Sequence, residues 1–146
     1  MLSKIIEDSK YIPKKFKYKL NNKLLTLSDE EKACTKPSWA YVFARDVAGA
    51  DIGKCCEAAY RDPYWAYIFA REIPGADIGK CQEAACQDPF YAYYFAKNIP
   101  GFNIEKCQES AYKNPYYAYL FALDIPGADK KRCTQAYQGT DICYLK

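Results

Sequence analysis

The chain has 146 residues, the length of one domain, and 50% of them are apolar, while the formal net charge is only +3. A charge this close to neutral does not by itself indicate a polyanionic partner, and no apolar run approaches the roughly 18 residues of a membrane span. The chain has no histidine, the usual proton carrier at neutral pH, and no glycine-rich phosphate loop, GxSxG or HExxH motif. We therefore expect a protein that is not an enzyme and that needs no cofactor or metal.

The positive charge is concentrated at the beginning of the chain. Residues 1–27 contain seven lysines and two acidic residues, a net charge of +5, and the remaining residues carry −2. This contrast predicts a basic N-terminal arm or cap over 1–27 and a helical repeat domain over 28–146. The opening "MLSKIIEDSK" lacks the long apolar core of a signal peptide, so we expect a cytoplasmic location inside the host cell, where thiols are normally reduced.

The arm "YIPKKFKYKLNNK" interleaves lysines with aromatic residues. Lysines that pair with phosphates and rings that stack on bases suit single-stranded nucleic acid. The candidate residues for such a contact are Lys14, Lys15, Phe16, Lys17, Tyr18 and Lys19. The same pattern fits docking on an acidic protein surface, or a short amphipathic segment that caps the helical domain, and the sequence leaves these alternatives open.

A short helix is predicted over residues 28–36. The stretch "SDEEKAC" places Ser28 and Glu31 at the spacing of a capping box, in which each side chain bonds a backbone N–H of the other residue. Cys34 in this stretch aligns with Tyr60 of the following unit. We interpret residues 28–36 as a half-repeat that caps one end of the array.

The rest of the chain repeats itself every 26 residues. The stretch "DPYWAYIFAREIPGADIGKCQEAACQ" is followed at once by "DPFYAYYFAKNIPGFNIEKCQESAYK". A proline and a glycine recur once in each unit, at Pro37, Pro63, Pro89 and Pro115 and at Gly49, Gly75, Gly101 and Gly127. The pattern predicts repeats at 37–62, 63–88, 89–114 and 115–138, with a C-terminal cap at 139–146.

Each unit divides into two short helices, here named helix A and helix B. Asp62 is a good N-cap, Pro63 suits the first helical position, and Pro74-Gly75 ends helix A. Asp77 then caps helix B. Helix A is predicted near 37–47, 63–73, 89–99 and 115–125, and helix B near 51–61, 77–87, 103–113 and 129–138.

Two helices of about ten residues cannot bury their apolar faces alone, so neighbouring units must stack. We expect an all-α fold, a right-handed α-solenoid of about four 26-residue helical hairpins with an N-terminal capping segment. On "DPYWAY", "NPYYAY" and "DPFYAYYFA", the chain resembles the Tyr/Ala-rich repeats of uncharacterised phage and bacterial proteins, and more generally HEAT- and TPR-type repeats. The resemblance implies no known activity, but it favours a phage or mobile-element inhibitor or adaptor that acts on a host complex.

One cysteine recurs in each unit, as Cys55, Cys81, Cys107 and Cys133. Equivalent positions on stacked helices lie about 8–10 Å apart, too far for a disulfide or a shared zinc ion, so we interpret these residues as small core filler. The roles of Cys34, Cys56, Cys86 and Cys143 stay open. Tyr67 and its equivalents are predicted to lie between helices with the hydroxyl bonded to backbone or water, and Lys80/Glu83 and their equivalents to form i,i+3 ion pairs on helix B.

The side of helix A opposite the core is too apolar for an ordinary solvated surface. We call its candidate partner-binding residues the ridge: Tyr64, Ile68, Arg71, Phe90, Tyr94, Lys97, Tyr116, Leu120 and Leu123. In the first unit the same positions are Ser38, Val42 and Arg45. Aromatic and arginine anchors are typical of protein interfaces, which favours a larger host or viral protein as the partner. Three alternatives stay open. The chain could bind nucleic acid through the arm and an Arg45/Arg71/Lys97 ladder, or form a homodimer through the ridge. Tight curvature or the N-terminal segment could instead bury the ridge.

Overall fold

The computed structural model describes residues 19–20, 23–24 and 29–138. Within these residues nine helices follow one another, and a single antiparallel pair of two-residue strands places Lys19 opposite Leu24. The elements are β1 (Lys19–Leu20), β2 (Lys23–Leu24), α2 (Glu30–Ala33), α3 (Pro37–Asp46), α4 (Ile52–Ala59), α5 (Pro63–Glu72), α6 (Ile78–Ala85), α7 (Pro89–Asn98), α8 (Ile104–Ala111), α9 (Pro115–Asp124) and α10 (Lys130–Tyr137). The predicted all-α class is confirmed. The predicted C-terminal cap and most of the predicted arm lie outside the described residues.

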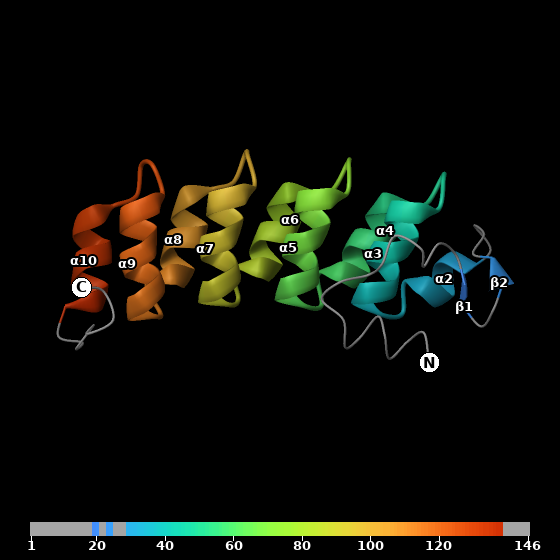
Figure 1. The fold of residues 1–146 in the computed structure, drawn as a ribbon, viewed down its shortest axis with the longest axis horizontal. Helices are drawn as coiled ribbons and strands as arrows, with labels where there is room; N and C mark the ends of the chain where they lie inside the picture. Colours follow the sequence, from blue (N-terminus) through green and yellow to red (C-terminus); the bar gives the residue numbers. More distant parts are fainter. Residues whose placement is uncertain (1–18, 21–22, 25–28, 139–146) are drawn as a thin grey trace.

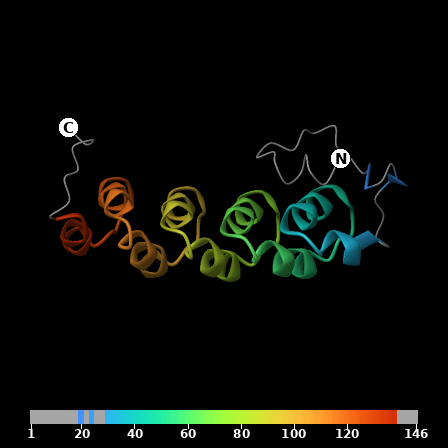
Figure 2. The same cartoon turned by 90° about the horizontal axis from the view of Figure 1, so that it is seen from below.

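The helices form two layers. Figure 1 shows that they follow one another in chain order along the long axis of the molecule, from α2 to α10. Seen end-on in Figure 2, α3, α5, α7 and α9 form one layer, here the A layer, and α2, α4, α6, α8 and α10 form the other, the B layer. Each A helix packs against the B helix that follows it and against the next A helix. No helix in this described part is long and apolar enough to cross a membrane.

The predicted signals begin and end the A helices. In α5, Pro63 occupies the first turn and the Asp62 carboxylate accepts hydrogen bonds from the backbone N–H groups of Tyr64 and Trp65, at 2.9 and 3.2 Å. The helix ends one residue earlier than predicted because Ile73 takes an extended conformation (φ −100°, ψ 113°). The side chain of Ile73 is buried like those of the helix A core face. Its spacing from those residues therefore predicted a helical position, although its backbone is extended.

The B helices are also shorter than predicted. The Asp77 carboxylate accepts from the N–H of Lys80 at 3.1 Å and begins α6. After Ala85 the chain tightens, because the N–H groups of Gln87 and Asp88 bond carbonyls only three residues back. In α2 the N-cap position is Asp29, whose side chain makes no capping bond, and Ser28 lies outside the described residues.

The core lies between the two layers. Each unit contributes one fully buried phenylalanine and one fully buried cysteine from the predicted ladder. These residues are Phe43, Phe69, Phe95 and Phe121 from the A layer, and Cys55, Cys81, Cys107 and Cys133 from the B layer. The burial predicted for the once-per-unit cysteines is therefore confirmed.

Polar side chains join successive B helices. The buried amide of Gln82 donates to the carbonyl of Asn103 at 2.5 Å and accepts from its N–H at 2.9 Å. One unit later, Gln108 accepts from the N–H of Asp129 at 2.6 Å. At the N-terminal end, Glu30 of α2 accepts from the N–H of Asp51 at 2.6 Å. Each of these side chains thus holds the N-cap residue of the next B helix.

Candidate partner-binding surface

The ridge lies on the outer side of the A layer, and the structure divides it along its length. Three of its residues are well exposed: Phe90 at 40%, Tyr116 at 45% and Leu123 at 65%. No other large hydrophobic side chain in the described part of the chain is exposed to this degree. The exposed apolar surface is therefore concentrated on α7 and α9.

Towards the N-terminal end the same positions are covered. Ile68, predicted to face a partner, is only 7% exposed, and Ser38 and Val42 are 3% and 4% exposed. Equivalent positions of the repeat thus differ in solvent exposure. Because Ile68 is buried, it cannot serve as a partner-binding anchor in this conformation. Tyr64 is half-buried.

Ring contacts fix the exposed part of the ridge. Phe90 packs against Tyr94 with ring centroids 4.7 Å apart, and it meets Tyr117 of the next A helix edge-on at 5.8 Å. Tyr116 leans on Tyr117 in the same way at 5.2 Å. Tyr94 and Leu120, ridge positions on the same two helices, are half-buried, and the contact with Tyr94 holds the Phe90 ring. We call Phe90, Tyr94, Tyr116, Leu120 and Leu123 the apolar patch.

The second ring position of each A helix makes contacts between units that were not predicted. Trp65 packs on Tyr41 of the previous unit at 5.5 Å, and Tyr117 packs on Tyr93 at 6.2 Å. The recurring Trp or Tyr two residues after each proline was the available signal. It could have been read as a contact between units, because its side chain is large in every unit but belongs to neither the core face nor the ridge.

The predicted cation ladder is paired with carboxylates. Arg45 bonds Asp46 through two nitrogens, at 2.9 and 2.6 Å, and Arg71 bonds Glu72 at 2.5 Å. Lys97 bonds Asp124 at 2.8 Å. The ladder therefore presents balanced charges rather than the basic stripe that phosphate binding needs.

The repeated tyrosine of helix A was predicted to bond backbone or water from a position between helices, but its partner is a side chain of the next unit. Tyr41 donates its hydroxyl proton to Glu72, and Tyr67 accepts from the amide of Asn98 at 2.9 Å. Both partners lie 31 residues further along the chain. Burial first, and then the bond to Glu72, raise the pKa of Tyr41 to about 12.

The candidate nucleic-acid residues cannot be placed. Lys14, Lys15, Phe16, Lys17 and Tyr18 lie outside the described residues. The backbone of Lys19 belongs to β1, opposite Leu24 of β2. The arm therefore stays a prediction.

Ion pairs on the B layer link units instead of stabilising single helices. Lys106 bonds Glu83 at 2.7 Å, and Arg132 bonds Glu109 at 2.7 Å, 23 residues apart in both cases. The predicted i,i+3 partners are thus replaced by partners in the preceding unit.

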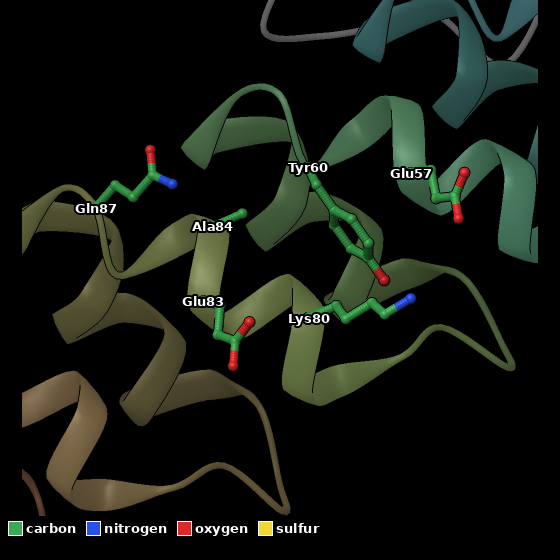
Figure 3. A pocket seen from close by; sticks show the side chains of 6 residues that line it. All are labelled: Glu57, Tyr60, Lys80, Glu83, Ala84 and Gln87. Carbon is green, nitrogen blue, oxygen red and sulfur yellow. The ribbon is translucent and has the colours of Figure 1, made fainter.

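A pocket of about 390 Å³ opens on the B layer between α4 and α6. It is lined by Glu57, Tyr60, Lys80, Glu83, Ala84 and Gln87. Figure 3 shows the Tyr60 ring projecting from α4 towards Lys80 of the next helix. Within the described residues no ion pair joins Glu57 to Lys80, although the equivalent pairs, Glu83 with Lys106 and Glu109 with Arg132, form at the next two junctions of the B layer.

The described residues contain no group of three or more His, Cys, Asp or Glu side chains that could hold a metal ion. The structure places an apolar patch on stacked helices, beside paired charges. Comparison of the chain with protein-family models, curated proteins and solved structures finds no match.

Proposed function

We propose that the chain is a non-catalytic protein–protein interaction module that binds a larger protein through the apolar patch on α7 and α9. We further infer that it is a right-handed α-solenoid of about four 26-residue hairpins, in keeping with the regular alternation of A and B helices. In such an array the patch is held by neighbouring units on a stiff scaffold, so little conformational freedom is lost on binding.

The observation that carries this proposal is the location of the exposed large hydrophobic side chains. All three in the described part of the chain, Phe90, Tyr116 and Leu123, belong to the patch. Leu123 stands where the earlier units have Arg45, Arg71 and Lys97. The last A helix therefore replaces a paired cation with an exposed apolar side chain, which favours a desolvated contact with a protein.

We propose a host or viral protein as the partner and an inhibitor or adaptor as the role. The resemblance to phage-type Tyr/Ala-rich repeats supports this choice. A cytoplasmic location agrees with the seven free cysteines of the described residues, since cytoplasmic thiols are normally kept reduced.

The test replaces the three exposed side chains together, as Phe90→Ser, Tyr116→Ser and Leu123→Ser. Tagged wild type and triple variant are used for affinity capture from the native host, with and without nuclease, and captured proteins are identified by mass spectrometry. We expect the triple variant to lose the partner while it stays folded by circular dichroism, because these side chains lie outside the core; the lost ring contacts should lower its melting temperature only by a few degrees. The control replaces two exposed lysines, Lys113→Ser in the turn after α8 and Lys131→Ser on α10, and should retain the partner.

Three results would speak against the proposal. The triple variant could capture the same protein as the wild type, or nuclease could abolish capture, which would favour the nucleic-acid alternative. Light scattering could instead show a dimer that the triple variant converts to a monomer, which would assign the patch to self-assembly.

A further inference from the structure

Three pairs of cysteine thiols meet across successive junctions of the B layer. The Sγ atoms of Cys86 and Cys107 lie 3.4 Å apart. The sulfurs of Cys56 and Cys81 are 3.7 Å apart, and those of Cys34 and Cys55 are 3.8 Å apart. The pairs share no residue, and they connect α2 to α4, α4 to α6, and α6 to α8.

Two repeat positions produce these contacts. The residue that follows each B helix points at the buried cysteine 21 residues later, and it is cysteine at Cys34 and Cys86 but tyrosine at Tyr60 and Tyr112. The second position is that of Gln82, whose side chain contacts the buried cysteine 25 residues later: its amide donates to the sulfur of Cys107 at 3.1 Å. In the preceding unit this position is Cys56, which creates the pair with Cys81.

We propose that these pairs are reversible disulfide sites, which oxidation closes to staple α2, α4, α6 and α8 to one another. The sulfurs are already in contact, and a disulfide of about 2.05 Å requires each pair to approach by less than about 2 Å. The inference goes beyond the proposed interaction function and does not depend on it.

Cys86 is the thiol we expect to react first. Its side chain is partly exposed, whereas Cys107 is fully buried. Hydrogen bonding by the Cys107 thiol lowers the pKa of Cys86 in spite of burial, and Lys106 and Lys113 also favour the thiolate. For Cys107, the hydrogen bond with Cys86 and burial both raise the pKa.

Hydrogen peroxide serves as the two-electron oxidant. The Cys86 thiolate attacks one peroxide oxygen, the O–O bond breaks, and the released hydroxide takes a proton to leave as water. The Cys107 sulfur then attacks the resulting sulfenic acid, loses its proton, and expels the sulfenic oxygen as a second water. Both sulfurs are oxidised to the disulfide, and the peroxide is reduced to two waters.

The pair behind the pocket should react later. The hydrogen bond with the Cys81 thiol and the one with Tyr60 lower the pKa of Cys56 to about 7, so access and not thiolate formation delays this pair. Cys56 is only 2% exposed, and its Sγ lies 2.8 Å from the hydroxyl of Tyr60, whose ring lines the pocket in Figure 3. Tyr60 thus stands between the sulfur and solvent. At the last junction Gln108 and Tyr112 occupy the two positions, so Cys133 meets no second thiol among the described residues and serves as an internal control.

The experiment uses the full chain, reduced and then titrated with hydrogen peroxide. Free thiols are counted, and disulfide-linked peptides are mapped by mass spectrometry. We expect the Cys86–Cys107 link first, followed by the other two, so that six of the eight cysteine thiols are lost. A reducing dithiol should restore all of them.

Two variants carry residues that the repeat already accepts at these positions. Cys86→Tyr copies Tyr60 and Tyr112, and it should abolish the link to Cys107 while the link between Cys34 and Cys55 still forms. Cys56→Gln copies Gln82 and should remove only the link to Cys81. The proposal is overturned if the peptide map lacks the Cys86–Cys107 link, or if the links join separate molecules.

Discussion

The hydrogen bonds of Gln82 predict a measurable contribution to the stability of one junction. Replacing Gln82 with alanine removes two bonds to the backbone of Asn103 and a weaker one to the sulfur of Cys107. A neutral hydrogen bond contributes about 1 kcal/mol net, so the two backbone bonds account for about 2 kcal/mol. Because Asn103 is exposed, water can replace the lost partners, which keeps the cost near this value.

Urea unfolding followed by circular dichroism at 222 nm measures the effect. We expect Gln82→Ala to lower the free energy of unfolding by about 2 kcal/mol, which corresponds to a fall of about 6 °C in Tm for a chain of this size. Gln87→Ala, an exposed position in the turn after the same helix, is the control and should change stability by less than about 0.5 kcal/mol. If both variants unfold at the same urea concentration, the bonds to Asn103 do not stabilise the junction.

Further predictions concern a turn glycine, a helix glycine and one carboxylate. Gly101 has φ of +76° with open space around it, so Gly101→Ala should destabilise by about 1–2 kcal/mol through the backbone alone. Gly79 is the second residue of α6, where an added Cβ would lie 3.4 Å from the capping Oδ1 of Asp77, so Gly79→Ala should stabilise by less than about 1 kcal/mol. Equal Tm values for the two variants would contradict both expectations. Burial opposes ionisation of Glu72, but hydrogen bonds from Arg71 and Tyr41 outweigh it and lower the pKa of Glu72 below the usual 4.5. A lowered pKa stabilises the fold above pH 4.5 and loses this effect as the pH falls further, so the stability difference between wild type and Glu72→Gln should shrink in acid, and a constant difference would refute the assignment.

The sequence predicted the helices well because each one carries its own signals. Asp62-Pro63 and Asp77 mark helix starts, and Gly75 marks the turn between them, so local chemistry was sufficient. Contacts between units were harder to predict. The spacing argument compared only equivalent positions, whereas Cys86 and Cys107 occupy different positions of the repeat and meet at an offset of 21 residues.

The candidate site was predicted in part. A helical wheel placed Phe90 and Tyr116 on the outer side, where they are exposed. The wheel treats every unit alike, however, and so it could not anticipate that Ile68 is buried or that Arg45 and Arg71 are paired with the acidic residue beside each of them.

The side-chain bonds between units have a consequence for how such a chain can evolve. Between units, the Tyr67 hydroxyl bonds the following A helix and the Gln82 side chain bonds the following B helix. Gain or loss of one whole 26-residue segment by recombination within the gene would therefore recreate the same bonds at the new boundary. Homologues of different length are then expected to differ by multiples of this segment, with the end units most free to diverge.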